Sequence, residues 1–117
     1  MKADLHLHST RSDGSWHRAS VLQQAAAVGL THIAFTEHDD TGYHDEALAL
    51  AAPLGLRVLC GTELSCADPA TGKKAHILAY LYTDPQPIEA LAAETRRQRQ
   101  ANCLWQVEVL HSMGYAI

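Results

Sequence analysis

Apolar and polar positions along the chain follow two periods that alternate. Short apolar runs of strand character occupy residues 2–8, 31–35, 56–64 and 75–82. Residues 16–28 and 43–55, which separate the first three runs, are rich in Ala and Leu at helical spacing. This alternation predicts an α/β fold in which parallel strands are joined by right-handed crossovers.

The expected helices and turns have recognisable boundaries. Ser15 is a suitable N-cap for the first helix, and Gly29 is a suitable glycine at its C-terminal end. Residues 65–74 contain Asp-Pro and Thr-Gly turn signals before the last apolar run. A long third helix is expected from Ile88 to about Met113, because strong helix formers carry apolar residues at helical spacing there.

Composition and charge limit the size of the fold and the kinds of partner. The 117 residues are enough for one small domain, and 47% hydrophobic with 19% charged residues is typical of a globular chain. The formal net charge of −4 provides no basic field, so we expect no double-stranded nucleic acid as a partner. No apolar run is long enough to span a bilayer, so no membrane partner is expected. The lack of signal-peptide zones and of a CxxC cysteine pair predicts a cytoplasmic protein.

The first apolar run carries two histidines one residue apart. A strand period of two sends Asp4, His6 and His8 to one face. Two imidazoles about 7 Å apart along a strand can bind one ion where the strand end curls. By itself this pair is equally compatible with two hydrogen-bonded histidines in a core or at an edge.

Four further metal-binding side chains lie at or near the ends of the expected strands. They are Asp13 after the first strand, His38 after the second, Glu63 at the end of the third and His76 at the start of the fourth. Chemistry gathers at the carboxyl ends of strands in α/β folds, so we expect these side chains to meet in space. Imidazole and carboxylate ligands without a thiolate favour Mn²⁺, Fe²⁺ or Zn²⁺.

The motifs around these residues together resemble the PHP superfamily of metal-dependent phosphoesterases, named for polymerase and histidinol phosphatase domains. The resemblance rests on DLHLHSTRSDG, GLTHIAFTEHDD, GTELS and AHILAY, and it covers nearly the whole chain. It implies a distorted (β/α)7 barrel of TIM-like form with two or three divalent metal ions, Mn²⁺ first, at the strand ends. The barrel would be incomplete in this chain. Residues 1–84 would supply its N-terminal part, and residues 85–117 a helical insertion that faces the substrate.

Carried over residue by residue, the resemblance implies a ligand role for six side chains. One metal takes His6 and His8, Glu63 bridges, His76 binds a second metal, and Asp13 and His38 bind a third. All six would contribute to catalysis through the metals, which activate a hydroxide. The family completes its site with a later His or Cys and an Asp-x-His pair, and His111 lies in no such context.

Three polar residues of the long helix are candidates for substrate binding. Arg96, Arg99 and Asn102 recur at i, i+3 and i+6, and guanidinium groups bind phosphate bidentately. An ordinary solvated helix face, balanced by Glu89 and Glu94, is an equal alternative. Within the family, the chain is most similar to enzymes that remove the 3′-phosphate of nucleoside 3′,5′-bisphosphates or trim short RNA from its 5′ end. A small phosphorylated nucleotide or short oligonucleotide is therefore the expected substrate.

Two other functions stay open on the sequence. One is a non-catalytic, truncated half-barrel that binds metal or a partner domain, because the late ligands are missing. The other is amidohydrolase chemistry on C–N bonds, which uses similar HxH sites but usually adds a carboxylated lysine. No lysine lies at an expected strand end to fill that role.

Overall fold

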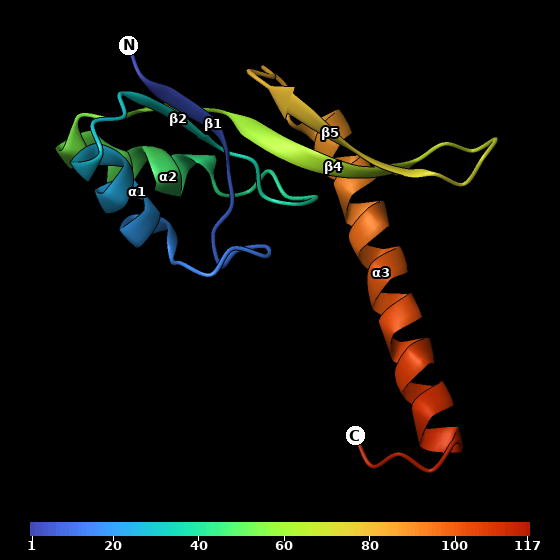
Figure 1. The fold of residues 1–117 in the computed structure, drawn as a ribbon. Coiled ribbons are helices and arrows are strands. Elements are labelled where there is room, and N and C mark those ends of the chain that lie inside the picture. The colour runs from blue at the N-terminus through green and yellow to red at the C-terminus, as the bar shows by residue number, and fades with distance from the viewer.

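Five strands divide between two sheets. In the computed structural model, which describes residues 1–117, β1 (Ala3–Leu7), β2 (His32–Phe35) and β3 (Arg57–Leu59) form a parallel sheet in that order. β4 (Gly61–Ala67) and β5 (Lys74–Tyr80) form an antiparallel pair beside it (Figure 1). A mixed α/β fold is therefore confirmed, but the expectation of parallel strands is wrong for the last pair.

The expected third strand, residues 56–64, is two strands because the chain changes partner at Cys60. A Cβ on Gly61 would lie 2.9 Å from the Phe35 carbonyl oxygen, so only glycine permits this close approach. The Tyr43 hydroxyl lies 2.7 Å from the Phe35 carbonyl oxygen and 2.5 Å from that of Gly61. β4 begins at this fixed point and pairs with β5.

The turn between β4 and β5 uses the Asp-Pro and Thr-Gly residues that the sequence singled out. The Asp68 backbone N–H donates to the Lys73 carbonyl at 2.9 Å, and the Asp68 carboxylate accepts from the Ala70 N–H at 2.9 Å. Gly72 has a φ of +70°, a left-handed conformation that glycine adopts without strain. Such a short turn joins antiparallel strands, whereas parallel neighbours need a long crossover.

Two helices cover one face of the three-stranded sheet (Figure 1). α1 (Arg18–Ala27) and α2 (His44–Ala51) pack on this sheet, and the short 3₁₀ helix η1 (Ala52–Leu54) follows α2. The core consists of Leu22, Ala25, Ile33, Phe35, Tyr43, Ala47, Ala51 and Leu56. This packing fixes the strand ends from which the site is built.

The predicted end of α1 is confirmed at its C-terminus but is wrong at its N-terminus. Gly29 follows the helix with a φ of +77°, as expected for a C-terminal glycine. At the other end His17 is the N-cap instead of Ser15, and its Nδ1 accepts a backbone N–H of the first turn at 3.5 Å. The Thr10 N–H donates to the Trp16 carbonyl at 3.0 Å, which keeps the chain in the preceding loop beyond Ser15.

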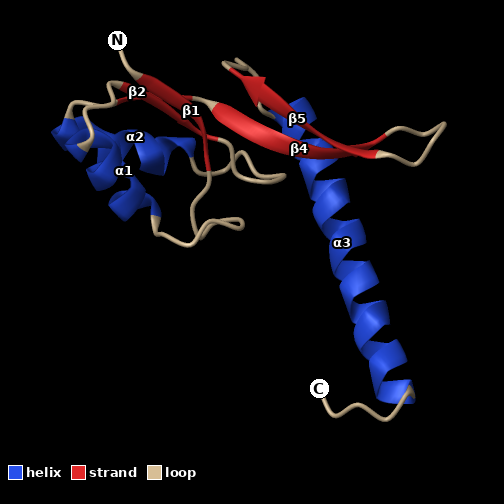
Figure 2. Ribbon diagram, viewed as in Figure 1, coloured by secondary structure: helices blue, strands red, loops and turns tan.

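α3 (Gln86–Ser112) is one helix of 27 residues whose two halves have different surroundings (Figure 2). Near its start Ala92 is buried, and Glu89 Oε2 accepts from the Thr41 hydroxyl at 2.8 Å. The later part projects away from both sheets, and Trp105 is 60% exposed. The expected long helix is confirmed. No helix of the structure combines the length and apolar content needed to cross a membrane.

The strands of residues 1–117 do not close into a barrel. An isolated parallel bridge between His38 and Glu63 connects the three-stranded sheet to the β4–β5 pair. The (β/α)7 barrel and the division of the chain at residue 84 therefore remain predictions.

Candidate metal centre

Glu63 lies at the middle of the histidine cluster. It is the third residue of β4, and its side chain is only 6% exposed. The Nε2 atoms of His6 and His8 each lie 3.0 Å from its Oε2. His76 Nδ1 lies 2.9 Å from the other carboxylate oxygen, Oε1. The two oxygens of one carboxylate therefore face different imidazoles.

Strand geometry explains why these side chains converge. His6 and His8 are two residues apart on one side of the chain at β1, and their ring centroids lie 5.1 Å apart. The β4–β5 register pairs His76 with Ser65, which makes His76 a diagonal neighbour of Glu63 on the same face. Because β5 runs antiparallel to β4, the early part of β5 lies beside the second half of β4.

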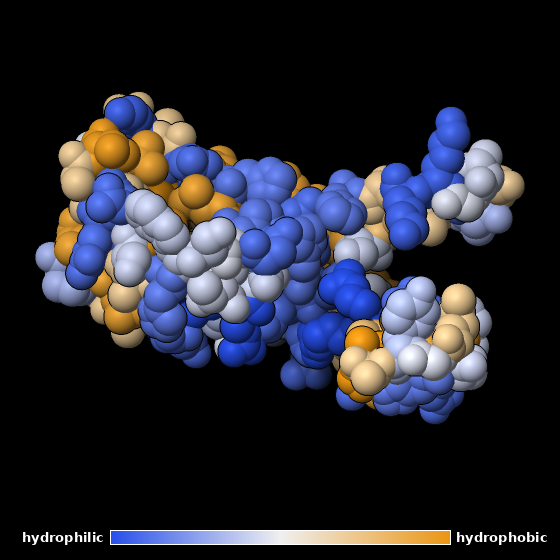
Figure 3. Space-filling view, turned by 60° about the horizontal axis from the view of Figure 1, so that its bottom comes forward, coloured by the Kyte–Doolittle hydropathy of each residue, from blue (hydrophilic) through white to orange (hydrophobic).

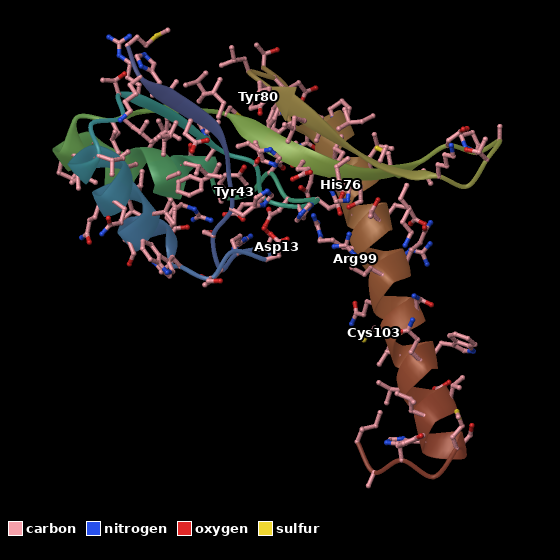
Figure 4. The ribbon with its side chains drawn as sticks, in the orientation of Figure 1. Asp13, Tyr43, His76, Tyr80, Arg99 and Cys103 are labelled. Carbon is pink, nitrogen blue, oxygen red and sulfur yellow. The ribbon has the colours of Figure 1, made fainter.

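The loops after β1 and β2 bring in Asp13 and His38. His38 Nε2 lies 3.3 Å from Asp13 Oδ2 and 3.8 Å from Glu63 Oε2. The other Asp13 oxygen lies 3.3 Å from His8 Nδ1. Backbone hydrogen bonds hold His38 beside β4, since the Glu63 N–H donates to the Glu37 carbonyl at 3.2 Å. In Figure 4, Asp13 and His76 both lie near the middle of the molecule.

All six expected ligands thus lie in one cluster, and they form three groups suited to metal ions. Within each group the ligand atoms lie within 4.8 Å of one another; the groups are His6, His8 and Glu63; His8, Asp13 and His38; and His38, Glu63 and His76. Ligands about 2.1 Å from a common ion lie roughly 3 to 3.5 Å apart, and the observed contacts match this spacing. The donors are imidazole nitrogens and carboxylate oxygens, so the residues present fit a divalent transition metal.

The histidines also set the ionisation of Glu63. Burial by itself would raise the pKa of this carboxyl. The hydrogen bond from His6 and the charges of the neighbouring histidines outweigh burial, and the pKa of Glu63 is lowered. The carboxylate at the middle of the cluster is therefore ionised, which is the form that can bind a cation.

A second buried glutamate, Glu37, was not recognised from the sequence. It is fully buried and accepts from the Ser9 backbone N–H at 3.2 Å and from the Ser12 hydroxyl at 2.6 Å. The Ser9 hydroxyl also donates to it, and Arg18 Nη2 lies 3.5 Å from its Oε1. The alternation of the THIAFTEHD segment, which turns Glu37 away from His38, is the signal that could have identified it.

Asp39 is a third buried carboxylate beside the cluster. It has a φ of +51°, in the left-handed region that Asp tolerates better than most residues. Its Oδ1 accepts from the Ser65 N–H at 2.8 Å, and its Oδ2 accepts from the Ser65 hydroxyl at 2.7 Å and from Arg99 at 2.9 Å. Asp39 therefore links the loop after β2 to both β4 and α3.

The three substrate-binding candidates of α3 do not share one pocket. Arg99 and Asn102 line a pocket of about 520 Å³ together with His76. Arg96 lines a separate pocket of about 580 Å³ with Arg11, and it contacts Glu89 and the Asp39 carbonyl. Hydrophilic side chains dominate the middle of the face in Figure 3, and in Figure 4 Arg99 points toward the cluster while Cys103 lies farther along α3.

Comparison with known families and proteins identifies one family over most of the chain. A model of the PHP domain matches residues 4–102. A phosphoribosyl 1,2-cyclic phosphate 1,2-diphosphodiesterase from Eggerthella lenta is 42% identical over 118 residues, which cover 100% of this chain and 45% of that protein. A 3′,5′-nucleoside bisphosphate phosphatase from Chromobacterium violaceum is 45% identical over 62 residues, 53% of this chain and 22% of that protein. A 5′-3′ exoribonuclease from Haemophilus influenzae is 33% identical over 74% of this chain and 31% of its own length.

Solved structures share the fold over nearly the whole chain. A candidate metal-dependent phosphoesterase from Bifidobacterium adolescentis superimposes with a TM-score of 0.83 at 31% identity, covering 95% of this chain and 39% of that one. An amidohydrolase from Chromobacterium violaceum, solved with bound sulfate and no metal, has a TM-score of 0.82 at 31% identity. The match covers 100% of this chain and 41% of that one. The chain spans less than half the length of each of these proteins.

Proposed function

The chain belongs to the PHP domain family, and on this premise we propose that it acts as a metal-dependent phosphoesterase. One observation carries the proposal. Imidazole nitrogens from β1 and β5 lie 2.9–3.0 Å from the two oxygens of a single buried carboxylate, Glu63. Such a cluster of imidazoles around a single carboxylate is suited to adjacent divalent cations.

Each ligand has a proposed place. His6 and His8 would hold one cation, His76 would hold a second, and Glu63 would offer an oxygen to each. Asp13 and His38 would hold a third, with Mn²⁺ preferred over Fe²⁺ or Zn²⁺. This assignment is supported by the division of the six residues into three groups of close ligand atoms, and by the exposure of Asp13, whose side chain is 66% exposed at the rim.

When bound, closely spaced cations polarise phosphate oxygens, lower the pKa of water toward about 7 and neutralise charge on the attacking and leaving oxygens. The chain's own residues keep the site ready for them. Glu63 stays ionised because its histidine neighbours lower its pKa. Asp39 anchors the loop that carries His38, and through Arg99 it holds α3 against the same loop.

The proposed substrate is a phosphate ester of a small nucleotide, such as a nucleoside 3′,5′-bisphosphate, or of a short single-stranded oligonucleotide. The names of the three relatives share phosphorylated ribose compounds, which supports this class. Arg99 and Asn102, which line a pocket with His76, are proposed to hold a second phosphate. Residues 85–117 then form the substrate-facing part, and residues 1–84 form the part that carries the metals.

Amidohydrolase chemistry is a second candidate because a structural neighbour is named for it. Lys74 is the first residue of β5, contrary to the expectation that no lysine lies at a strand end. Lys74 lines the pocket that contains His76, but the contacts of Glu63 and the histidines are with one another and with Asp13, and no lysine is among them. The phosphoesterase assignment is therefore preferred.

The test combines metal content with turnover by the 117-residue chain. Elemental analysis is paired with manganese-dependent phosphate release from adenosine 3′,5′-bisphosphate and from phosphoribosyl 1,2-cyclic phosphate. We expect the wild-type chain and His17→Ala, a matched histidine variant outside the cluster, to bind metal stoichiometrically. We expect Glu63→Gln, which keeps the size of the side chain but removes its charge, to lose the metal and the turnover.

Three outcomes would contradict parts of this proposal. Equal metal content in the wild type and in Glu63→Gln would refute the bridging role. Bound metal without turnover of either phosphate compound would favour the non-catalytic alternative. Hydrolysis of an amide substrate in place of the phosphate esters would favour the amidohydrolase assignment.

A further inference from the structure

We propose that Glu37, acting through Ser12, fixes the tautomer of His8 so that Nδ1 carries the proton and Nε2 is free to bind a metal. This inference rests on the proposed metal centre and adds two positioning residues to it. It follows from counting the protons in one chain of hydrogen bonds that runs from the buried Glu37 to the cluster.

The first link is the carboxylate of Glu37, which can only accept. It is fully buried, and the groups around it are donors: the Ser9 backbone N–H, two hydroxyls and the Arg18 guanidinium, whose Nη2 lies 3.5 Å from its Oε1. A carboxylate paired with a guanidinium accepts hydrogen bonds from its other neighbours and donates none. Every hydroxyl in hydrogen-bond contact with it, that of Ser9 and that of Ser12, must therefore donate to it.

The second link is the hydroxyl of Ser12, which has one proton. Its Oγ lies 2.6 Å from Glu37 Oε2, the shortest of its contacts, so this proton is committed to Glu37. The same Oγ lies 3.3 Å from His8 Nδ1. Toward His8 it can therefore only accept, and Nδ1 must be the donor.

The third link is the imidazole of His8. With the proton on Nδ1, the other nitrogen presents a lone pair, and it lies 3.0 Å from Glu63 Oε2. Two lone pairs at this distance repel each other unless a cation lies between them. The chain of hydrogen bonds thus prepares Nε2 as a ligand at the position where Glu63 supplies its oxygen.

Asp13 is the competing partner for His8 Nδ1. Its Oδ1 also lies 3.3 Å from that nitrogen, and it too would accept a proton from it. Its side chain is 66% exposed, and its other oxygen faces His38, so it is free to move with a metal. Ser12 is held by a buried carboxylate, and for this reason we assign the positioning role to Ser12 and Glu37.

The experiment measures zinc affinity and the position of the His8 proton, with no assay of turnover. Zinc binding is titrated in the full chain, and long-range ¹H–¹⁵N spectra of the zinc-loaded chain report which His8 nitrogen is protonated. We expect Nδ1 to be protonated in the wild type. Ser12→Ala should weaken zinc binding about 10-fold to 100-fold, the range found when a partner of a metal-bound histidine is removed.

Three further variants separate positioning from general damage. Ser12→Thr keeps a hydroxyl and should restore wild-type affinity, and Ser15→Ala, the same change at an exposed serine of the same loop, should have no effect. Glu37→Gln can donate to Ser12 and so frees the Ser12 proton to turn toward His8 Nδ1. It should weaken zinc binding in the same direction as Ser12→Ala.

The outcomes are distinguishable from failure of the metal centre itself. If wild type binds zinc and Ser12→Ala binds it equally well, or if zinc is bound through Nδ1 of His8, the positioning role is wrong and the centre stands. If the wild-type chain binds no zinc, the metal centre is wrong and this inference is overturned with it.

Discussion

Two buried glutamates, Glu37 and Glu63, lie close to one another in the fold, but different kinds of side chain contact them. Glu37 is surrounded by groups that can only donate to it or balance its charge, namely two serines and an arginine. Glu63 is surrounded by imidazoles, each of which can donate a proton or offer a lone pair. All the partners of the first carboxylate come from the protein, and the partners of the second are groups that could share a cation with it.

The contrast shows that burial alone does not identify a functional acid. Both side chains are nearly inaccessible to water, and both belong to short polar segments that follow or begin strands. Only the nature of the partners separates a carboxylate that stabilises the fold from one that binds a ligand. Four predictions test this distinction, from the largest expected effect to the smallest.

Replacing Arg18 with Met should be the most damaging change to stability. Arg18 is 4% exposed and lies over the rings of Phe35 and Tyr43, beside Glu37. Removing one partner of a buried ion pair leaves the other charge uncompensated, and we expect a loss of about 3 kcal/mol in the free energy of unfolding. Chemical denaturation of the metal-free chain measures it.

Glu46→Gln is the matched control for that change. Glu46 is the other carboxylate partner of Arg18, but its side chain is 54% exposed. Its loss should cost less than about 1 kcal/mol, as is usual for an exposed ion pair. Equal costs for the two variants would mean that burial of the Glu37 pair does not matter.

Zinc should stabilise the wild-type chain, and the effect should depend on Glu63. A ligand that binds only the folded state adds about 2.7 kcal/mol when its free concentration is 100 times the Kd. We expect this gain in the wild type, its reversal by EDTA, and its absence in Glu63→Gln. A zinc-dependent rise in Tm that survives in Glu63→Gln would place the ion elsewhere.

Arg99→Ala tests a third buried acid, Asp39, whose partners resemble those of Glu37 but include one exposed side chain. Asp39 is buried like Glu37, yet one of its partners, Arg99, is itself 57% exposed and lines the pocket beside His76. We expect KM for a nucleoside bisphosphate to rise about 10-fold, and KM for a monophosphate to rise much less, because only the first has a phosphate for Arg99. Equal increases for both substrates would remove the second-phosphate role.

Of the four predicted effects, that of Tyr43→Phe should be the smallest. The ring stays beneath Arg18, while the hydroxyl that contacts the carbonyls of Phe35 and Gly61 is lost. A buried hydrogen bond contributes about 1 kcal/mol, so a loss of that size is expected in the free energy of unfolding. Zinc affinity should be unchanged, since Tyr43 contacts no candidate ligand. A weaker affinity would show that the hydrophobic core around Tyr43 and the histidine cluster are not independent.

The sequence by itself located most of the secondary structure and the six candidate ligands. Periodicity predicted β1, β2 and the three α-helices because their apolar residues recur at strand or helix spacing, and this held even for α3, where only Ala92 is buried. The ligands were recognisable because His and acidic residues at strand ends stand out against apolar runs, and a motif of this kind is local. The turn before β5 was readable for the same reason.

Only the tertiary structure decided how those elements pair and which acids are satisfied. The switch at Cys60 depends on the contact of Gly61 with the distant Phe35 carbonyl, so no local pattern could reveal that β4 leaves the parallel sheet. Glu37 and Glu63 look alike in the sequence, since each is one acid among polar neighbours. Their partners come from segments up to 57 residues away, and long-range packing sets whether those partners are serines or histidines.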